Sequence, residues 1–178
     1  MARYFIDTEF VEDGKTIDLI SIGIVCSDGR EYYAINRDCD FSKASDWVKD
    51  NVLIHLPPRP ESLEWVENTS HHAKQGWRNK SWIADEITGF VLRGYDPSKP
   101  RTENFWDLDN PLDKDPEFWA DYAAYDWVAL CQTFGTMMDL PKGFPMYCND
   151  TQQEARRLGN PTLPEQIGIK HHALYDAR

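Results

Sequence analysis

Three segments near the N-terminus carry the apolar patterns of β-strands. They run from Arg3 to Phe10, from Asp18 to Cys26 and from Glu31 to Asn36. Between the second and third segments the chain reads Asp28-Gly29, a dipeptide that favours the tight turn of a β-hairpin. We therefore expect three consecutive strands that pair as an antiparallel meander.

Helical and extended patterns alternate along the rest of the chain. Residues 42–54 are predicted to form a helix capped by Ser42, which the proline cluster at 57, 58 and 60 ends. Residues 61–80 and 97–116 are polar or loop-like. The other predicted elements are a buried strand over Phe118–Tyr125 and helices over Ser81–Leu92, Trp127–Phe134 and Thr151–Leu158, the last capped by Asp150 or Thr151. This order of strands and helices predicts a layered α/β fold.

Length and composition favour one folded domain over residues 1–178. The chain has 178 residues, of which 41% are hydrophobic, enough to bury a core. No apolar run approaches the ~20 residues that a membrane span requires, and no charged-then-apolar leader opens the chain. The four cysteines are scattered and form no CxxC pair. We therefore expect a cytoplasmic protein with reduced thiols and no membrane partner.

The net charge narrows the class of nucleic acid that the chain can bind. At −11, it argues against broad duplex binding, which relies on dense Lys and Arg contacts to phosphates. A short single-stranded substrate whose phosphates meet bound cations remains compatible with this charge.

Candidate catalytic residues lie near both ends of the chain. The first predicted strand contains Asp7 and Glu9, and side chains two residues apart in a strand share a face. His171 and Asp176 lie about one and a half turns apart in a predicted helix that opens with His171. Asp126 lies between the two motifs in the sequence. Four carboxylates and a histidine are what a two-metal phosphodiester hydrolase needs.

Each motif alone has an ordinary structural interpretation. Asp7 can begin a solvated loop, Asp126 can be the N-cap of its helix, and His171 with Asp176 can be a surface pair. The conjunction of three motifs, each at a strand end or a helix start, favours the catalytic interpretation. By contrast, His71-His72 has no cysteine or acidic partner at zinc-ligand spacing, and we interpret this pair as part of a solvated loop.

These motifs resemble those of a known nuclease superfamily. Asp7-Thr8-Glu9, Asp126 and His171-x4-Asp176 resemble the three motifs of the DEDD exonucleases, in the branch with a histidine in the third motif. The segments 7–14, 19–23, 29–34 and 124–132 are similar to the small exoribonuclease AS family, known from mycobacteria. The resemblance implies a ribonuclease H-like fold, a five-stranded mixed sheet flanked by helices. It also implies 3′-5′ hydrolysis of adenylate-containing, single-stranded RNA, with a homodimer left open.

The resemblance and the charges together imply roles for the site residues. Asp7, Glu9, Asp126 and Asp176 are expected to hold two Mg²⁺ or Mn²⁺ ions, which prefer oxygen ligands. His171 is the expected general base, because the usual pKa of histidine lies near neutrality. The expected substrate contacts are Thr8, Phe10 and Ser21, the last standing where many relatives carry an acidic residue. Relatives also continue the last helix beyond Arg178, so we expect this helix to be cut short here.

Rival functions come from other classes. A 3′-5′ exodeoxyribonuclease needs the same catalytic set, and nothing in the sequence reads the 2′-hydroxyl. A non-catalytic nucleic-acid-binding module of the same fold is disfavoured because all five active-site residues are present. A calcium-stabilised structural domain is weakest, since no Asp-x-Asp-x-Asp-Gly loop occurs.

Overall fold

The computed structural model describes residues 2–59, 76–95 and 115–178. Its first three strands are β1 (Arg3–Glu12), β2 (Ile17–Cys26) and β3 (Glu31–Asn36), which pair as the predicted antiparallel meander. The turn between β2 and β3 contains Gly29, whose φ of 91° lies in the left-handed region that favours glycine. His71 and His72, with most of the two predicted polar stretches, lie outside the described residues.

Within the described residues the sheet has six strands, in the order β4-β3-β2-β1-β5-β6, where five were predicted. β5 (Glu117–Ala120) runs parallel to β1, β6 (Asn149–Asp150) runs parallel to β5, and β4 (Trp77–Arg78) runs parallel to β3. β5 is shorter than predicted because the backbone turns at Tyr122, whose φ is 53°. The mixed sheet with flanking helices confirms the α/β class and is consistent with a ribonuclease H-like fold.

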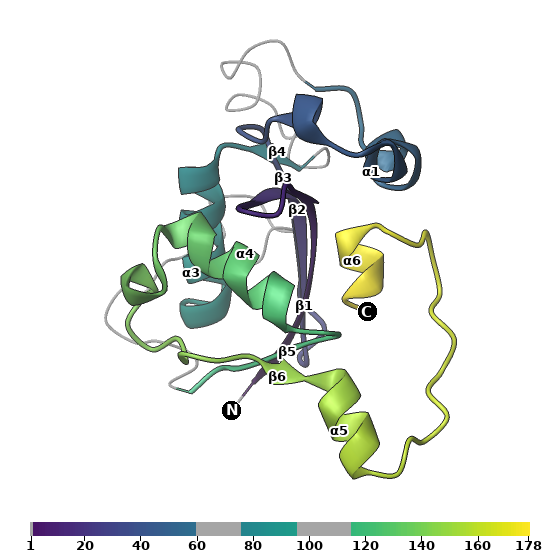
Figure 1. Cartoon of the computed structure of the whole chain (residues 1–178). Coiled ribbons are helices and arrows are strands. Elements are labelled where there is room, and N and C mark those ends of the chain that lie inside the picture. The colour runs from purple at the N-terminus through teal and green to yellow at the C-terminus, as the bar shows by residue number, and fades with distance from the viewer. Residues whose placement is uncertain (1, 60–75, 96–114) are drawn as a thin grey trace.

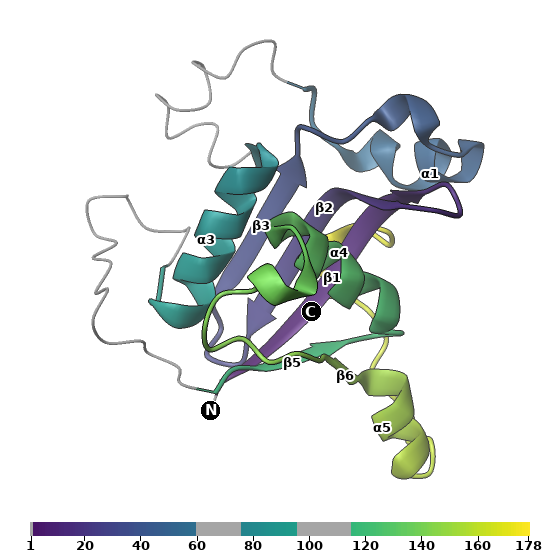
Figure 2. The ribbon, with the colours of Figure 1, turned by 60° about the vertical axis from the view of Figure 1, so that its left-hand side comes forward.

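Helices cover both faces of this sheet. α3 (Lys80–Leu92) and α4 (Ala124–Phe134) pack on one face, while the short α6 (Ala173–Asp176) packs on the other (Figures 1 and 2). α5 (Thr151–Arg157) begins at the N-cap Asp150, as predicted. The α6 segment therefore lies on the side of the sheet opposite the two longer helices, where the α1 region also packs, against Val11 and Ile20.

The helix predicted over residues 42–54 is broken into three pieces. They are the 3-10 turn η1 (Phe41–Lys43), α1 (Asp46–Asn51) and the 3-10 turn η2 (Leu53–His55). The break occurs because Ala44 is extended, and Ser45 rather than Ser42 caps α1 by accepting the N–H of Val48. Another 3-10 turn, η5 (Met137–Asp139), follows α4.

The main core fills the space between the sheet and the two longer helices. Tyr4 and Ile6 of β1 point into it, and Ile87 and Phe90 meet them from α3. Within the described part of the chain, no helix is long and apolar enough to cross a membrane. All four cysteines are free, as expected for reduced thiols.

Candidate active site

The first two motifs meet at the edge where β1 passes the start of α4. Asp7 and Glu9 alternate with Thr8 along β1, so the two carboxylates share the face opposite the main core. The backbone N–H and the hydroxyl of Thr8 both donate to Oδ1 of Asp126, at 2.8 and 2.7 Å. Asp126 lies in the first turn of α4, and the N-cap is Ala123, so the N-cap interpretation of Asp126 is wrong. These bonds fix the Asp126 carboxylate beside β1.

The third motif is built differently from the helix that the sequence predicted. His171 does not open a helix, because its φ is 60° and α6 begins only at Ala173. Asp176 is the last residue of α6, and its carboxylate accepts the backbone N–H of His172 at 3.1 Å and the side-chain amide of Gln166. The left-handed backbone at His171 turns the chain immediately before the helix, so both functional side chains still reach one site.

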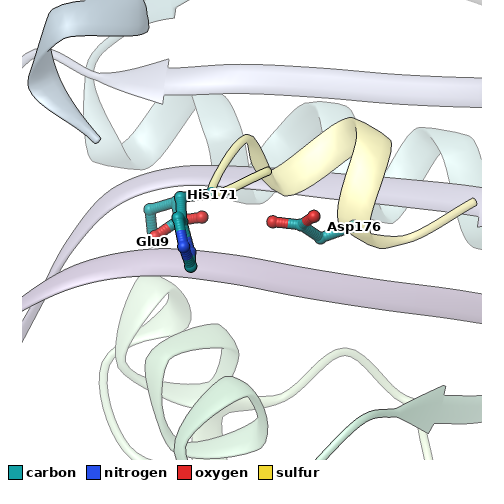
Figure 3. Close-up of side chains that lie close together, drawn as sticks. All are labelled: Glu9, His171 and Asp176. Carbon is teal, nitrogen blue, oxygen red and sulfur yellow. The ribbon is translucent and has the colours of Figure 1, made fainter. Parts of the chain in front are cut away.

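Three of the predicted site residues converge within ligand distance of one another. Glu9, His171 and Asp176 each offer a ligand atom, and these atoms lie within 4.8 Å of one another. Figure 3 shows the side chains of Glu9 on β1 and of His171 and Asp176 on the C-terminal segment directed toward a common space. Asp7 and Asp126 lie close enough for their charges to act on this group. The structure thus brings all three sequence motifs together.

The electrostatics of the cluster favour a bound cation. Burial, followed by repulsion from Asp126 and Glu9, raises the pKa of Asp7 to about 9. Burial and repulsion from Asp176 raise the pKa of Glu9 to about 8, and burial raises the pKa of Asp126 as well. Among the described residues, no lysine or arginine is ion-paired with these carboxylates. This oxygen-rich, uncompensated donor set fits Mg²⁺ or Mn²⁺.

A fifth acidic residue, Asp121, borders the site and was missed from the sequence. It follows β5 directly, and its Oδ1 accepts the hydroxyl of Thr151 at 2.6 Å and the side-chain amide of Gln152 at 2.8 Å. Its charge contributes to the raised pKa values of Asp7 and Asp126. The signal was available, because Asp121 is an acid at the C-terminal end of a strand that runs parallel to β1.

Exposed or partly exposed aromatic rings contact or adjoin residues of the candidate site. The ring of Trp47, which is 55% exposed, lies nearly perpendicular to the ring of His171, at a centroid distance of 4.8 Å and an interplanar angle of 75°. On the other side Phe10 and Tyr125 stack at 5.6 Å with an interplanar angle of 11°. A cavity of about 290 Å³ between α4 and the turn joining β1 to β2 has Tyr125 in its wall. Neither Trp47 nor Tyr125 was identified from the sequence.

The three residues expected to contact the substrate differ in the exposed fraction of their side chains. Thr8 is 6% exposed, and its backbone N–H and its hydroxyl both donate hydrogen bonds to Asp126. Ser21 is 1% exposed and faces Glu9 across the β1–β2 ladder. Phe10 lies two residues after Thr8 and therefore shares the face of β1 toward α4, where its ring stacks on Tyr125. A direct contact of any of the three with substrate stays a prediction.

Comparison with known proteins finds one family and its named members. The model of the 3′-5′ exoribonuclease Rv2179c-like domain matches residues 2–178. The 3′-5′ exoribonuclease Rv2179c of Mycobacterium tuberculosis strain H37Rv is 39% identical over 177 residues, which cover 99% of this chain and 87% of that protein. The 3′-5′ exoribonuclease MT2234.1 of strain CDC 1551 matches with the same identity and coverage.

Proposed function

The chain belongs to the 3′-5′ exoribonuclease Rv2179c-like domain family, and from this premise we propose a specific activity. We propose that it is a metal-dependent exoribonuclease that releases 5′-mononucleotides from the 3′ end of single-stranded, adenylate-rich RNA. The observation that carries the proposal is the convergence of Glu9, His171 and Asp176, with Asp7 and Asp126 beside them. Like charges concentrated in this way destabilise the metal-free site, which a role in metal binding explains.

Four carboxylates would hold the metal ions: Asp7, Glu9, Asp126 and Asp176. Their charges support this, because besides burial, repulsion from Asp126, Glu9 and Asp176 raises the pKa of Asp7, and repulsion from Asp176 and Asp126 raises that of Glu9. When bound, two Mg²⁺ or Mn²⁺ ions would supply the positive charge that activates a water and stabilises the leaving 3′ oxygen. Asp121 would add negative charge at the border of the site and is held there by α5.

His171 would act as the general base. It would take the proton from the attacking water while the water oxygen bonds to phosphorus and the P–O3′ bond breaks, and the leaving O3′ would take up a proton from solvent. The products would be a 5′-mononucleotide and an RNA shortened by one residue with a free 3′-hydroxyl. The Trp47 ring, whose centroid lies 4.8 Å from that of the imidazole, would limit the orientations available to His171.

The flanking rings would bind the bases of the substrate. Trp47 presents exposed aromatic surface beside His171, and the Phe10–Tyr125 pair presents exposed or partly exposed surface next to Glu9 and Asp126 in the chain. Base–aromatic stacking contributes ~1–3 kcal/mol per base, and purines stack more strongly than pyrimidines. These surfaces support adenylate over uridylate. They also support a single strand, because the bases of a duplex are not free to stack on protein.

A time course on labelled homopolymers tests this substrate assignment. The 5′-labelled oligomers of A, C and U, and of deoxyadenylate, are incubated with Mg²⁺ and then with Mn²⁺, using wild type and Trp47→Ala. We expect adenylate RNA to be shortened fastest and this preference to diminish in Trp47→Ala. Equal rates on uridylate would overturn the adenylate assignment, and equal rates on DNA would favour an exodeoxyribonuclease with the same site.

A further inference from the structure

Gly23 lies in the middle of the sheet face that α6 covers. A Cβ atom added to Gly23 would lie 2.3 Å from the carbonyl oxygen of Ala173 and 2.5 Å from Cα of Leu174. Both are backbone atoms, so neither can be moved aside by a change of rotamer. Gly23 does not have the positive φ that would require glycine for conformation. Its missing side chain therefore matters for space, namely for the close approach of α6 to β2.

The segment that rests on Gly23 carries both C-terminal members of the active site. His171 precedes Ala173 by two residues, and Asp176 is the last residue of the same turn of helix. Gly23 is also the cross-strand partner of Asp7 on β1. The depth at which α6 sits over Gly23 thus sets the distance from Asp176 and His171 to the carboxylates of β1.

Two contacts with β3 hold the same segment as well. The ring of Tyr33, the β3 partner of Gly23, stacks on His172 at 4.6 Å with an interplanar angle of 21°. The guanidinium of Arg178 forms a bidentate ion pair with Glu31, at 2.8 and 2.7 Å. A helix of one turn has little stability of its own. Its position must therefore come from such contacts.

We infer that Gly23 is a positioning residue of the active site, supported by Tyr33 and by the Glu31–Arg178 pair. Because Gly23 has no side chain, α6 packs close enough to β2 for Asp176 and His171 to complete the metal-binding group with Glu9. This inference rests on the proposed function, because it assigns Gly23 a task in metal binding rather than in stability alone. Misplacement of a catalytic group by about 1 Å can cost ~10²-fold in rate.

The test compares Mn²⁺ binding to the full chain in Gly23→Ala and in a matched control, by electron paramagnetic resonance of the free ion. The control is Ile22→Val, which removes one methylene from the buried core on the opposite face and leaves α6 untouched. We expect Gly23→Ala to weaken Mn²⁺ binding at least ~10-fold and to lower kcat by ~10²-fold, with KM changed much less. Ile22→Val should bind Mn²⁺ as wild type does.

A folded Gly23→Ala protein with wild-type Mn²⁺ affinity would overturn the inference. If Gly23→Ala does not fold, the Glu31–Arg178 ion pair provides a second test. Glu31→Arg and Arg178→Glu should each weaken Mn²⁺ binding by a few-fold. The double variant, which restores the ion pair with its charges exchanged, should restore the Mn²⁺ affinity. Failure of the double variant to restore affinity would then overturn the inference. Failure of the proposed function is seen separately, as equal Mn²⁺ binding in wild type and Asp7→Ala.

Discussion

His171 occupies a backbone conformation that few residues other than glycine adopt. Its φ is 60°, and its side chain contacts Trp47 and offers a ligand atom within 4.8 Å of those of Glu9 and Asp176. A non-glycine residue in this region costs free energy, and such residues cluster at functional sites where the surrounding contacts hold them. The strain at His171 is thus consistent with a residue kept for its chemistry.

Replacement of the two adjacent histidines should have unequal effects. His171→Ala is expected to lower kcat by roughly 10²–10⁴-fold, the usual loss when a general base is removed. His172→Ala should have a much smaller effect, because His172 packs against Tyr33 and Tyr175 and burial lowers its pKa. Steady-state kinetics on an adenylate oligomer measures both. Equal losses would show that His171 is not the base.

The candidate site residues that the structure brings together were identified from the sequence, whereas several of their neighbours were not. Asp7 and Glu9 share a face because side chains in a strand alternate between its two faces, so this can be inferred from their spacing in the sequence alone. Trp47 and Gly23 gain their importance only from contacts with segments more than a hundred residues away in the chain. No local pattern of apolar and polar residues encodes such contacts.

Among the elements that form the site, the C-terminal segment has the least regular secondary structure to hold it in place. α6 has four residues, and the connector that precedes it, residues 159–170, is exposed throughout. In Figure 1 this connector runs along the outside of the molecule from α5 to α6. A bound metal ion would therefore add a large share of the contacts that hold α6 on the sheet.

Trypsin cleavage after Lys170 should detect this coupling between metal binding and the docking of α6 on the sheet. Cleavage after Lys170 requires the chain around His171 to leave the sheet, and Mn²⁺ held by Asp176 opposes this, so we expect Mn²⁺ to slow this cleavage ~10-fold or more. Cleavage after the exposed Arg157, at the end of α5, is the internal control and should be insensitive to Mn²⁺. Mass spectrometry of the fragments measures both rates. Equal protection at both sites, or none at Lys170, would contradict the coupling.

Elements with many local signals were predicted well, and elements defined by distant pairing were not. The meander of β1, β2 and β3 follows from alternating residues and the Asp28-Gly29 turn. The strands β4 and β6 have two residues each and are defined by their pairing with β3 and β5. They are too short to show an alternating pattern of apolar and polar residues in the sequence. The helix predicted to open at His171 was wrong because tertiary docking, not helix propensity, shapes that segment.

For the whole molecule, the clustered carboxylates link stability to pH. The folded-state pKa values of Asp7 and Glu9, about 9 and about 8, lie above their ordinary values of 3.8 and 4.5. The folded protein therefore binds protons more tightly than the unfolded chain at these groups. Their contribution to stability is complete below about pH 4 and is lost as pH rises to about 9. Without metal, stability should fall across this range.

Asp7→Asn should reverse this loss. In EDTA at pH 8 to 9 we expect its Tm to exceed that of wild type by at least about 2–4 °C, the shift that ~1 kcal/mol produces in a chain of this size. Mg²⁺ should raise the Tm of wild type more than that of Asp7→Asn, because the variant has lost a ligand. Asp85→Asn, an exposed carboxylate on α3, is the control. A lower Tm for Asp7→Asn than for wild type in EDTA would contradict the account.

The most direct test of the central claim is the product pattern of wild type and Asp7→Ala on one 5′-labelled, single-stranded adenylate RNA. Wild type with Mg²⁺ should shorten the RNA one nucleotide at a time from the 3′ end and release 5′-mononucleotides, and EDTA should stop this. Asp7→Ala should keep the fold, measured by circular dichroism, and lose the activity. Full activity in Asp7→Ala, or internal cleavage products from wild type, would contradict a carboxylate-held metal centre that acts on 3′ ends.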